Sequence, residues 1–307
     1  MAISATKDSD MNKIDFKLND MLSLPELSLA IGFFDGVHLG HQRLIDEVRN
    51  SIYQPSVLTF SLNMKSGLFS KEPQLLLTEE EKERKLEELG IKYDLVLDFT
   101  PDVRDLSVNE FLLLLRNLNC KKIVVGDDFT FGKGGQGKAT DLLALEKYGI
   151  EVKIISLLLS SGIKVSSTQI KKYLSEGKIQ EANQLLGYDY SLEGIVVKGL
   201  QNGRKIGFPT ANIILPKEKI RLWKGVYKSL TIIDGVKFKS MTNIGNHPTI
   251  DTLPEDIVES HVINFRGDLY GKTIKVVFLE KIRDQQKFSS FEELRDQLRC
   301  DCLIAKN

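Results

Sequence analysis

In the first half of the chain, short runs of apolar residues alternate with longer amphipathic stretches. The amphipathic stretches fit helices, and two of them begin with the pattern of a capping box, at Thr78–Glu81 and Ser107–Glu110. A further helix is predicted from Thr140 to Gly149. The apolar runs predict strands at Leu27–Ile31, Val57–Phe60, Asp94–Asp98, Lys122–Val125 and Val152–Ser156. This alternation predicts an α/β domain whose parallel sheet binds ligands at the carboxyl ends of its strands.

From about residue 191 the apolar positions alternate at shorter range, which is typical of antiparallel strands. Asp234-Gly235 between apolar residues predicts a two-residue hairpin. Further strands are predicted at Glu193–Val197, Val258–Phe265 and Ile274–Leu279, and a final helix from the spacing of Phe288, Phe291, Leu294 and Leu298. We therefore expect a small antiparallel β-barrel or sandwich with a C-terminal helix. The predicted domains are residues 1–186 and 187–307.

Composition narrows the classes of function. The 307 residues carry 42 basic and 42 acidic side chains, so no overall positive field favours nucleic acid or an anionic membrane. The longest apolar clusters, Phe111–Leu115 and Ile154–Leu159, fit a core helix and a core strand and are too short to span a bilayer. The first twenty residues are polar, without a secretory apolar region. Three cysteines predict reduced thiols and a cytoplasmic protein: Cys120, Cys300 and Cys302.

The densest candidate chemistry is the segment 32–42, Gly-Phe-Phe-Asp-Gly-Val-His-Leu-Gly-His-Gln. It lies between the first predicted strand and an amphipathic helix over Arg43–Arg49. N–H groups at a helix start bind anions, and the three glycines let the backbone approach a ligand. His38 and His41 add ring N–H donors at a spacing of three residues. The combination suits a nucleotide triphosphate, although glycine-rich strand–helix turns also occur without ligands.

Two later segments are candidates for the same site. Gly126–Gly135 follows another predicted strand, and its Asp127 and Asp128 fit either polar contacts or turn residues. Val165–Lys171 places hydroxyl groups before a helical stretch that ends at Gly177. Hydroxyl groups at a helix start bind phosphate, but their commonest role is to cap the helix.

The pattern Gly-x-Phe-Asp-Gly-x-His-x-Gly-His resembles the signature of the HxGH nucleotidylyltransferases, and specifically of the bacterial FAD synthetases. The resemblance implies a Rossmann-like nucleotidylyltransferase domain in which the FMN phosphate attacks the α-phosphorus of ATP. It implies a flavin-binding region at Asp128 and Phe129. The implied ATP-binding residues are Gly32, Phe34, Asp35, Gly36, His38, Gly40, His41, Ser167, Thr168 and Lys171.

A second cluster of candidate residues spans Gly194–Asn212. Its glycine spacing does not match a Walker A loop, yet glycines beside Arg204 and Lys205 can cradle phosphates through backbone N–H groups. Thr210 and Asn212 share one face of an extended strand and offer neutral oxygens to a Mg²⁺ ion that keeps most of its waters. A glycine-rich turn with structural polar residues is the alternative interpretation.

Glu259 is the candidate base. In an extended segment it faces the same side as His261, Ile263 and Phe265. A carboxylate on an otherwise apolar face is either paired or chemically active, and an edge-strand charge is the alternative.

This half resembles riboflavin kinases through five blocks in the family's order. They are Gly-Arg-x-x-Gly-Phe-Pro-Thr-Ala-Asn, Gly225-Val226-Tyr227, Asn243-Ile244-Gly245 with Pro248-Thr249, Glu259-x-His261, and Leu269-Tyr270-Gly271. The resemblance implies that Thr210 and Asn212 serve Mg-ATP, and that Glu259 accepts the proton of the ribityl 5′-hydroxyl. The implied ATP-binding residues are Gly199, Gly203, Arg204, Lys205, Gly207, Pro209, Thr210 and Asn212.

The order of the two resemblances is that of bacterial bifunctional enzymes. It implies that riboflavin and ATP give FMN, and that FMN and a second ATP give FAD. The chain departs from the family at residues 59–65, which lack a Pro-His-Pro element, and at Lys171, where arginine is usual. These departures favour, as an alternative, a riboflavin kinase with a degenerate or specialised first domain. A flavin-sensing regulator is the third hypothesis, and self-association is left open.

Overall fold

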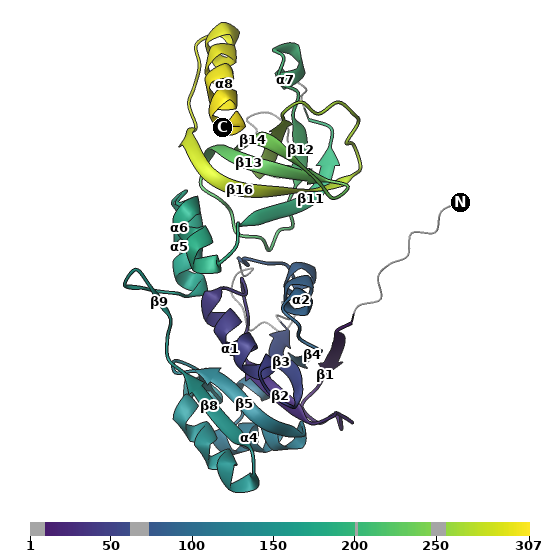
Figure 1. The fold of residues 1–307 in the computed structure, drawn as a ribbon, viewed down its shortest axis with the longest axis vertical. Coiled ribbons are helices and arrows are strands. Elements are labelled where there is room, and N and C mark those ends of the chain that lie inside the picture. The colour runs from purple at the N-terminus through teal and green to yellow at the C-terminus, as the bar shows by residue number, and fades with distance from the viewer. Residues whose placement is uncertain (1–9, 62–73, 200–201, 247–255) are drawn as a thin grey trace, which may run out of the picture. The chain divides into compact units, whose positions relative to one another are not determined.

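The computed structural model describes residues 10–61, 74–199, 202–246 and 256–307. The chain divides into two compact units, which are treated separately below (Figure 1). The first unit comprises Met1–Pro73 and Leu77–Val165, and the second comprises Gln74–Leu76 and Ser166–Asn307.

The first unit contains a six-stranded sheet in the order β1-β4-β3-β2-β5-β8, and every neighbouring pair is parallel (Figure 1). Its strands are β1 (Asn12–Phe16), β2 (Leu27–Ile31), β3 (Gln54–Ser61), β4 (Tyr93–Asp98), β5 (Cys120–Gly126) and β8 (Glu151–Ile155). Its helices are α1 (Leu39–Arg49), α2 (Glu79–Glu88), α3 (Pro101–Arg104) and α4 (Val108–Asn117), with 3-10 segments at Lys133–Gly135 and Ala139–Tyr148. Separate apolar clusters cover the sheet, so the predicted doubly covered parallel sheet is confirmed.

Local signals fixed most of these elements. Both capping boxes form, since the Thr78 hydroxyl accepts from Glu81 N–H and the Ser107 hydroxyl accepts from Glu110 N–H. The segment expected to be an α-helix from Thr140 is instead a 3-10 helix over Ala139–Tyr148. The expected core strand to Leu159 was wrong: β8 ends at Ile155, and Leu159 is 61% exposed.

A buried carboxylate lies inside the first unit. Asp94 of β4 is fully buried, and its Oδ1 accepts a hydrogen bond of 2.9 Å from the Thr59 hydroxyl of β3. Its Oδ2 has no hydrogen-bond partner among the described residues. Burial raises the pKa of Asp94 to about 6, against the opposing effects of Thr59 and Lys82.

We predict that Asp94→Asn stabilises the protein at neutral pH. The pKa of Asp94 is higher in the folded state than in the unfolded state, so the native protein loses stability as pH rises from about 4 to about 6. The neutral amide removes this loss, and we expect a gain of roughly 1–3 kcal/mol at pH 8 and little change at pH 4. Denaturant midpoints followed by circular dichroism measure the difference. The exposed Glu146→Gln is the matched control, and equal effects of Asp94→Asn at both pH values would contradict the prediction.

The second unit is built on a closed barrel in the order β11-β12-β15-β14-β13-β16. The strands are β11 (Ser191–Val197), β12 (Ala211–Ile214), β13 (Gly225–Ile233), β14 (Val236–Asn246), β15 (Asp256–Val262) and β16 (Thr273–Asp284). The pairings are antiparallel, so the barrel alternative of the prediction is confirmed. Asp234 and Gly235 form the predicted hairpin with positive φ angles of 48° and 80°.

Hydroxyl groups fill part of the barrel interior. Ser229, Thr231, Ser240, Thr242 and Ser260 are buried and hydrogen-bond to one another at 2.7–3.1 Å. Because side chains alternate along a strand, the residues next to them, such as Glu259 and Asn243, lie on the outer face.

The C-terminal helix α8 (Phe291–Lys306) packs on the outside of the barrel. It begins after Ser290, which caps it, so Phe288 lies outside the helix, and Phe291 is 68% exposed. The predicted apolar stripe was therefore partly wrong: Leu298, Cys302 and Ala305 face the barrel. The buried Asp301 pairs with Arg283 of β16 at 2.8 Å and holds the helix in place.

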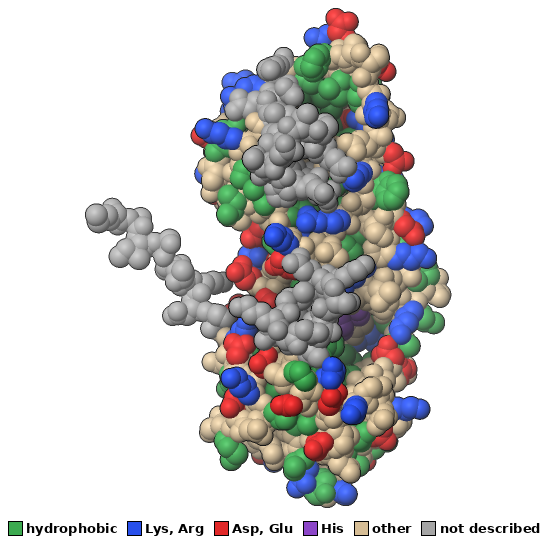
Figure 2. Space-filling view, turned by 180° about the vertical axis from the view of Figure 1, so that it is seen from behind, with side chains coloured by type: hydrophobic (Ala, Val, Ile, Leu, Met, Phe, Trp, Pro, Cys, Tyr) green, Lys and Arg blue, Asp and Glu red, His purple; other side chains and the backbone are tan. Residues whose placement is uncertain are grey.

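Two further helices belong to the second unit, α5 (Ser167–Ser175) and α6 (Ile179–Leu186). The segment Gln74–Leu76 also belongs to it, since Lys219 is buried and its Nζ donates to the Leu76 carbonyl at 2.7 Å. On the face in Figure 2 basic and acidic side chains are interspersed, in line with the zero net charge.

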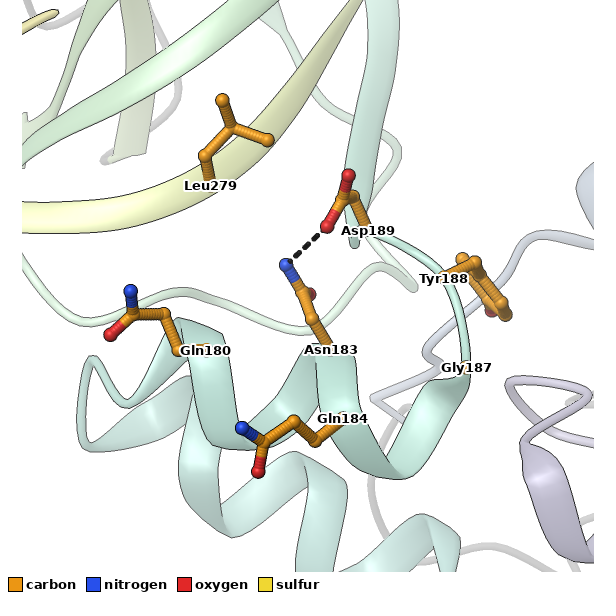
Figure 3. A pocket seen from close by; sticks show the side chains of 7 residues that line it. All are labelled: Gln180, Asn183, Gln184, Gly187, Tyr188, Asp189 and Leu279. Atoms are coloured by element: carbon orange, nitrogen blue, oxygen red, sulfur yellow. Dashed lines mark hydrogen bonds between the residues drawn. The ribbon is translucent and has the colours of Figure 1, made fainter. Parts of the chain in front are cut away.

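A hollow between α6 and β16 has a structural explanation (Figure 3). Asn183 lies at its centre and donates to Asp189 and to the Phe278 carbonyl, each at 3.0 Å. Its side-chain oxygen accepts from Tyr190 N–H at 2.9 Å. The amide thus joins α6 to β16 and to the segment that leads into β11, and both of its N–H groups are engaged in these contacts.

Candidate functional sites

Strand order places the first candidate site at the point where the sheet reverses its winding. From β2 the chain adds β3 and β4 on one side, and then β5 and β8 on the other. In such sheets the ligand crevice lies beyond the carboxyl ends of the two strands at the reversal, here β2 and β5. Segment 32–42 follows β2 and segment 126–135 follows β5, so the fold brings the two glycine-rich segments to one edge.

Two stacked imidazoles open helix α1. His38 is the N-cap residue, and its Nδ1 accepts a hydrogen bond of 3.3 Å from His41 N–H. The two rings stack with their centroids 3.7 Å apart. Since Nδ1 of His38 is an acceptor, the proton of its neutral ring is on Nε2. Gly40 permits this approach, because a Cβ there would lie 3.1 Å from the His38 ring.

Both imidazoles are neutral at pH 7. Burial lowers the pKa of His38 to about 4, although the carboxylates of Asp35 and Asp128 oppose this shift. Burial, and then the neighbouring His38, hold the pKa of His41 well below its usual range. His41 Nδ1 is buried without a hydrogen-bond partner among the residues that the structure describes. The pair offers neutral polar groups to an anion.

The loop before α1 holds an unusual backbone conformation. Phe34, Gly36 and Val37 have positive φ angles of 51°, 83° and 37°. Residues other than glycine are strained at positive φ angles, and such backbone strain is concentrated at functional sites. The Gln42 amide donates to the Val37 carbonyl at 2.9 Å, and the buried Phe34 ring contacts His41 at a centroid distance of 5.0 Å.

The predicted flavin residues follow β5. Asp128 is close enough to act on the pKa of His38, and it forms an ion pair of 2.8 Å with Lys164. Phe129 packs at the edge of the apolar core, with its ring 5.8 Å from that of Phe131. Asp127 instead stabilises the local chain, since its carboxylate accepts a hydrogen bond of 3.2 Å from Leu157 N–H.

The segment Val165–Lys171 was expected either to bind phosphate or to cap a helix, and the structure shows the capping role at one of its residues. Ser166 caps α5 by accepting from Gln169 N–H at 3.3 Å. Ser167, Thr168 and Lys171 lie on α5 itself, which belongs to the second unit. Their expected role at the ATP phosphates therefore stays a prediction.

An aromatic group that was not predicted from the sequence lies near the ends of three strands. Phe33, Phe60 and Phe99 follow or end β2, β3 and β4, and their ring centroids lie 5.2–6.2 Å apart. Phe33 is 48% exposed and Phe60 is buried, so the Phe33 ring is the largely accessible part of this group at the carboxyl edge of the sheet. Their shared position after predicted strands was the available signal, but strand order was needed to place them together.

The second candidate site is a row of polar side chains on the outer face of the barrel. Glu259 of β15 lies directly opposite Asn212 of β12 and Asn243 of β14. The Asn243 amide reaches the Glu259 carboxylate at 3.5 Å. Asn243 was missed as a site residue, because only the strand register places it beside Glu259.

The Asn212 amide occupies a confined position. Asn212 is buried, and its side-chain oxygen has no hydrogen-bond partner within the described part of the chain. A Cβ at Gly199 would lie 2.5 Å from this amide, so only glycine fits there. A buried acceptor without a partner is unfavourable, so this oxygen keeps the capacity to accept a hydrogen bond or to contact a cation.

The segment before β12 is tightly folded. The expected loop contains a single helical turn, α7 (Asn202–Lys205), which carries Gly203 and Arg204, and Gly207 has a φ of 89°. Phe208 N–H donates to the Gly203 carbonyl at 2.8 Å, and a Cβ at Gly203 would lie 2.2 Å from the Phe208 carbonyl. Pro209 and Thr210 then lead directly into β12.

The predicted strand to Phe265 was too long. Strand β15 ends at Val262, and Asn264 has a φ of 61°, so Ile263 and Phe265 do not continue the face of Glu259. Asparagine tolerates this left-handed conformation. Among the described residues no cluster of three His, Cys, Asp or Glu side chains is arranged to hold a metal ion, and no helix is long and apolar enough to cross a membrane.

Comparisons with known proteins match both halves. A model described as FAD synthetase matches residues 21–169, and one described as riboflavin kinase matches residues 186–307. A curated relative from Listeria monocytogenes, named bifunctional riboflavin kinase/FMN adenylyltransferase, is 35% identical over 280 residues, which cover 89% of each chain. The chain belongs to the bifunctional riboflavin kinase/FMN adenylyltransferase family. An Escherichia coli relative of the same name is 36% identical over 91% of each chain.

A solved structure from Streptococcus pneumoniae, described as a macrolide-efflux protein, has 34% identity and a TM-score of 0.86. The match covers 96% of this chain and 99% of that one. The first departure inferred from the resemblance is at residues 59–65, of which 62–65 lie outside the described residues. Lys171 is the other departure, on α5.

Proposed function

We propose that this chain phosphorylates riboflavin to FMN and then adenylylates FMN to FAD, with ATP as the second substrate of both reactions. Membership of the bifunctional family and the match of both halves to family models support the two activities together. The structural observation that supports the proposal is that, of the five buried side-chain atoms without hydrogen-bond partners in the described residues, two lie in the predicted sites, His41 Nδ1 in one and Asn212 Oδ1 in the other.

In the first unit we assign the ATP phosphates to the start of α1. The neutral His38 and His41 donate without carrying charge, and Gly32, Gly36 and Gly40 let the backbone approach the triphosphate. Phe34 and Asp35 belong to the loop before α1, in which Phe34 has a positive φ, whereas the assignment of Ser167, Thr168 and Lys171 rests on the family resemblance alone, because α5 belongs to the second unit. The FMN phosphate is ionised at neutral pH, so positioning and charge stabilisation are sufficient for its attack on the α-phosphorus.

The flavin ring of FMN is assigned to the edge beside this site. Asp128 and Phe129 follow β5, and the partly exposed Phe33 lies with Phe60 and Phe99 after the neighbouring strands. Aromatic side chains in this arrangement offer stacking surfaces to a planar heterocycle.

In the second unit we assign phosphoryl transfer to the row around Glu259. Glu259 accepts the proton of the ribityl 5′-hydroxyl, while the segment from Gly199 to Asn212 binds ATP through Gly203, Arg204, Lys205, Gly207 and Pro209. Thr210 and the Asn212 side-chain oxygen fit a Mg²⁺ ion that keeps most of its waters and binds substrate phosphates. When bound, that ion supplies positive charge to the transferring phosphate.

An end-point assay tests the proposal. Purified protein is incubated with riboflavin, ATP and Mg²⁺, and flavins are resolved by chromatography. We expect FMN first and FAD later. Formation of FMN without FAD, under both oxidising and reducing conditions, would refute the adenylyltransferase activity and support the kinase activity alone. An absence of both products would favour the flavin-sensing regulator and refute the enzyme.

The remaining proposals concern the domain bounds, the cellular compartment and the ligands. We keep residues 1–186 and 187–307 as the catalytic domains, although α5 and α6 pack within the second compact unit. The three cysteines are free, which supports a cytoplasmic protein without disulfides. Riboflavin, FMN, FAD and ATP are the proposed ligands, nucleic acid and membranes are not, and self-association stays open.

A further inference from the structure

His261 makes a contact that the functions above do not use. It lies two residues after Glu259 on β15, and its Nδ1 is 2.8 Å from the Pro209 carbonyl oxygen. A carbonyl oxygen only accepts, so the imidazole donates through Nδ1–H. This hydrogen bond joins the strand that carries Glu259 to the peptide unit that leads into Thr210.

The same imidazole contacts the residue before Pro209. The rings of Phe208 and His261 meet edge to face, with centroids 5.2 Å apart and planes at 66°. Phe208 in turn packs against the apolar cluster between the barrel and α8, which includes Val226 and Cys302. The side chain of Phe208 is therefore fixed by packing, whereas the peptide after Pro209 is fixed by a hydrogen bond.

The position of this hydrogen bond determines what it controls. The Pro209–Thr210 peptide is trans and planar, so its C=O and N–H point in opposite directions. Holding the carbonyl against His261 directs Thr210 N–H away from the imidazole. On the far side of Thr210, the chain is fixed by strand pairing of Ala211 with Ser260. Thr210 thus lies between two restraints, and His261 supplies the first.

We propose that His261 is a positioning residue of the kinase, which orients the Pro209–Thr210 peptide so that Thr210 and Asn212 face Mg-ATP beside Glu259. The inference rests on the proposed function of Thr210. Small displacements of a positioned group reduce rates strongly, by about 100-fold for 1 Å.

Two substitutions at this position separate the hydrogen bond from the packing. His261→Asn places an amide N–H near the position of Nδ1 and keeps the donor. His261→Phe keeps a ring against Phe208 and removes the donor. We expect His261→Phe to lower kcat for FMN formation by about 10- to 100-fold, with the KM for riboflavin nearly unchanged. We expect His261→Asn to restore the rate to within about threefold of the original protein, because the donor returns.

Conversion of supplied FMN to FAD by the same preparations is the internal control, and thermal unfolding is the second. A His261→Phe protein with full kinase activity would overturn the inference, and so would equal losses in His261→Phe and His261→Asn. Loss of FAD formation or a matching fall in Tm would assign His261 to folding instead. These outcomes leave the proposed function intact. A wild-type protein that forms no FMN would refute the proposed function, and the inference with it.

Discussion

Glu259→Gln is expected to lower kcat for FMN formation by about 10²–10⁴-fold, the usual contribution of a positioned general base. The carboxylate lies on β15 between Asn212 and Asn243, and the amide of Asn243 is within 3.5 Å of it. Glutamine has the same shape and keeps a polar contact with Asn243, but it cannot accept the proton of the ribityl hydroxyl. Initial rates at saturating riboflavin and Mg-ATP measure the effect.

The bifunctional chain provides a control for this variant. Conversion of supplied FMN to FAD should proceed at the original rate, because Glu259 belongs to the second unit and the α1 site to the first. Asn243→Ala is a companion variant, for which we expect a smaller loss, since it removes the neighbour of the carboxylate and leaves the base. FMN formation within tenfold of the original in Glu259→Gln would contradict the role of Glu259. Loss of both activities would contradict the model of two independent sites.

His38→Asn is expected to lower FAD formation from FMN by about 10²–10³-fold, the usual effect of removing one donor that stabilises transition-state charge. The substitution is selective because the two ring nitrogens of His38 have different tasks. Nδ1 accepts from His41 N–H and caps α1, which leaves Nε2–H as the donor for phosphate. Asparagine is a favourable N-cap residue, so it preserves the cap and removes the Nε2 donor.

His38→Ala is the matched comparison, since it removes both the cap and the donor. We expect it to lose activity to a similar extent and to lose about 1 kcal/mol of stability in addition. Thermal unfolding separates the two variants, and FMN formation from riboflavin reports on the second unit of each. A His38→Asn protein that forms FAD at the original rate would show that the Nε2 donor has no part in the reaction.

The limits of sequence-based prediction are clearest at particular elements. The capping boxes at Thr78 and Ser107 and the Asp234-Gly235 hairpin formed as predicted, because each depends on residues close together in the chain. The stripe on α8 was misjudged because Phe291 and Cys302 have different surroundings once the helix packs on the barrel. Strand β15 ends early because Asn264 adopts a left-handed conformation that the apolar pattern around it does not indicate.

Most local elements and the family resemblance of both halves could be predicted from the sequence, and His38, His41, Asn212 and Glu259 are site residues that it predicts. The fold was needed to show that Asn243 lies opposite Glu259, that β5 lies beside β2, and that burial lowers the pKa of both histidines. The physical reason is that capping, turn formation and motif spacing depend on neighbours in the chain. Register, strand order and the pKa of a buried imidazole depend on contacts between residues far apart in sequence, which exist only after the chain has folded.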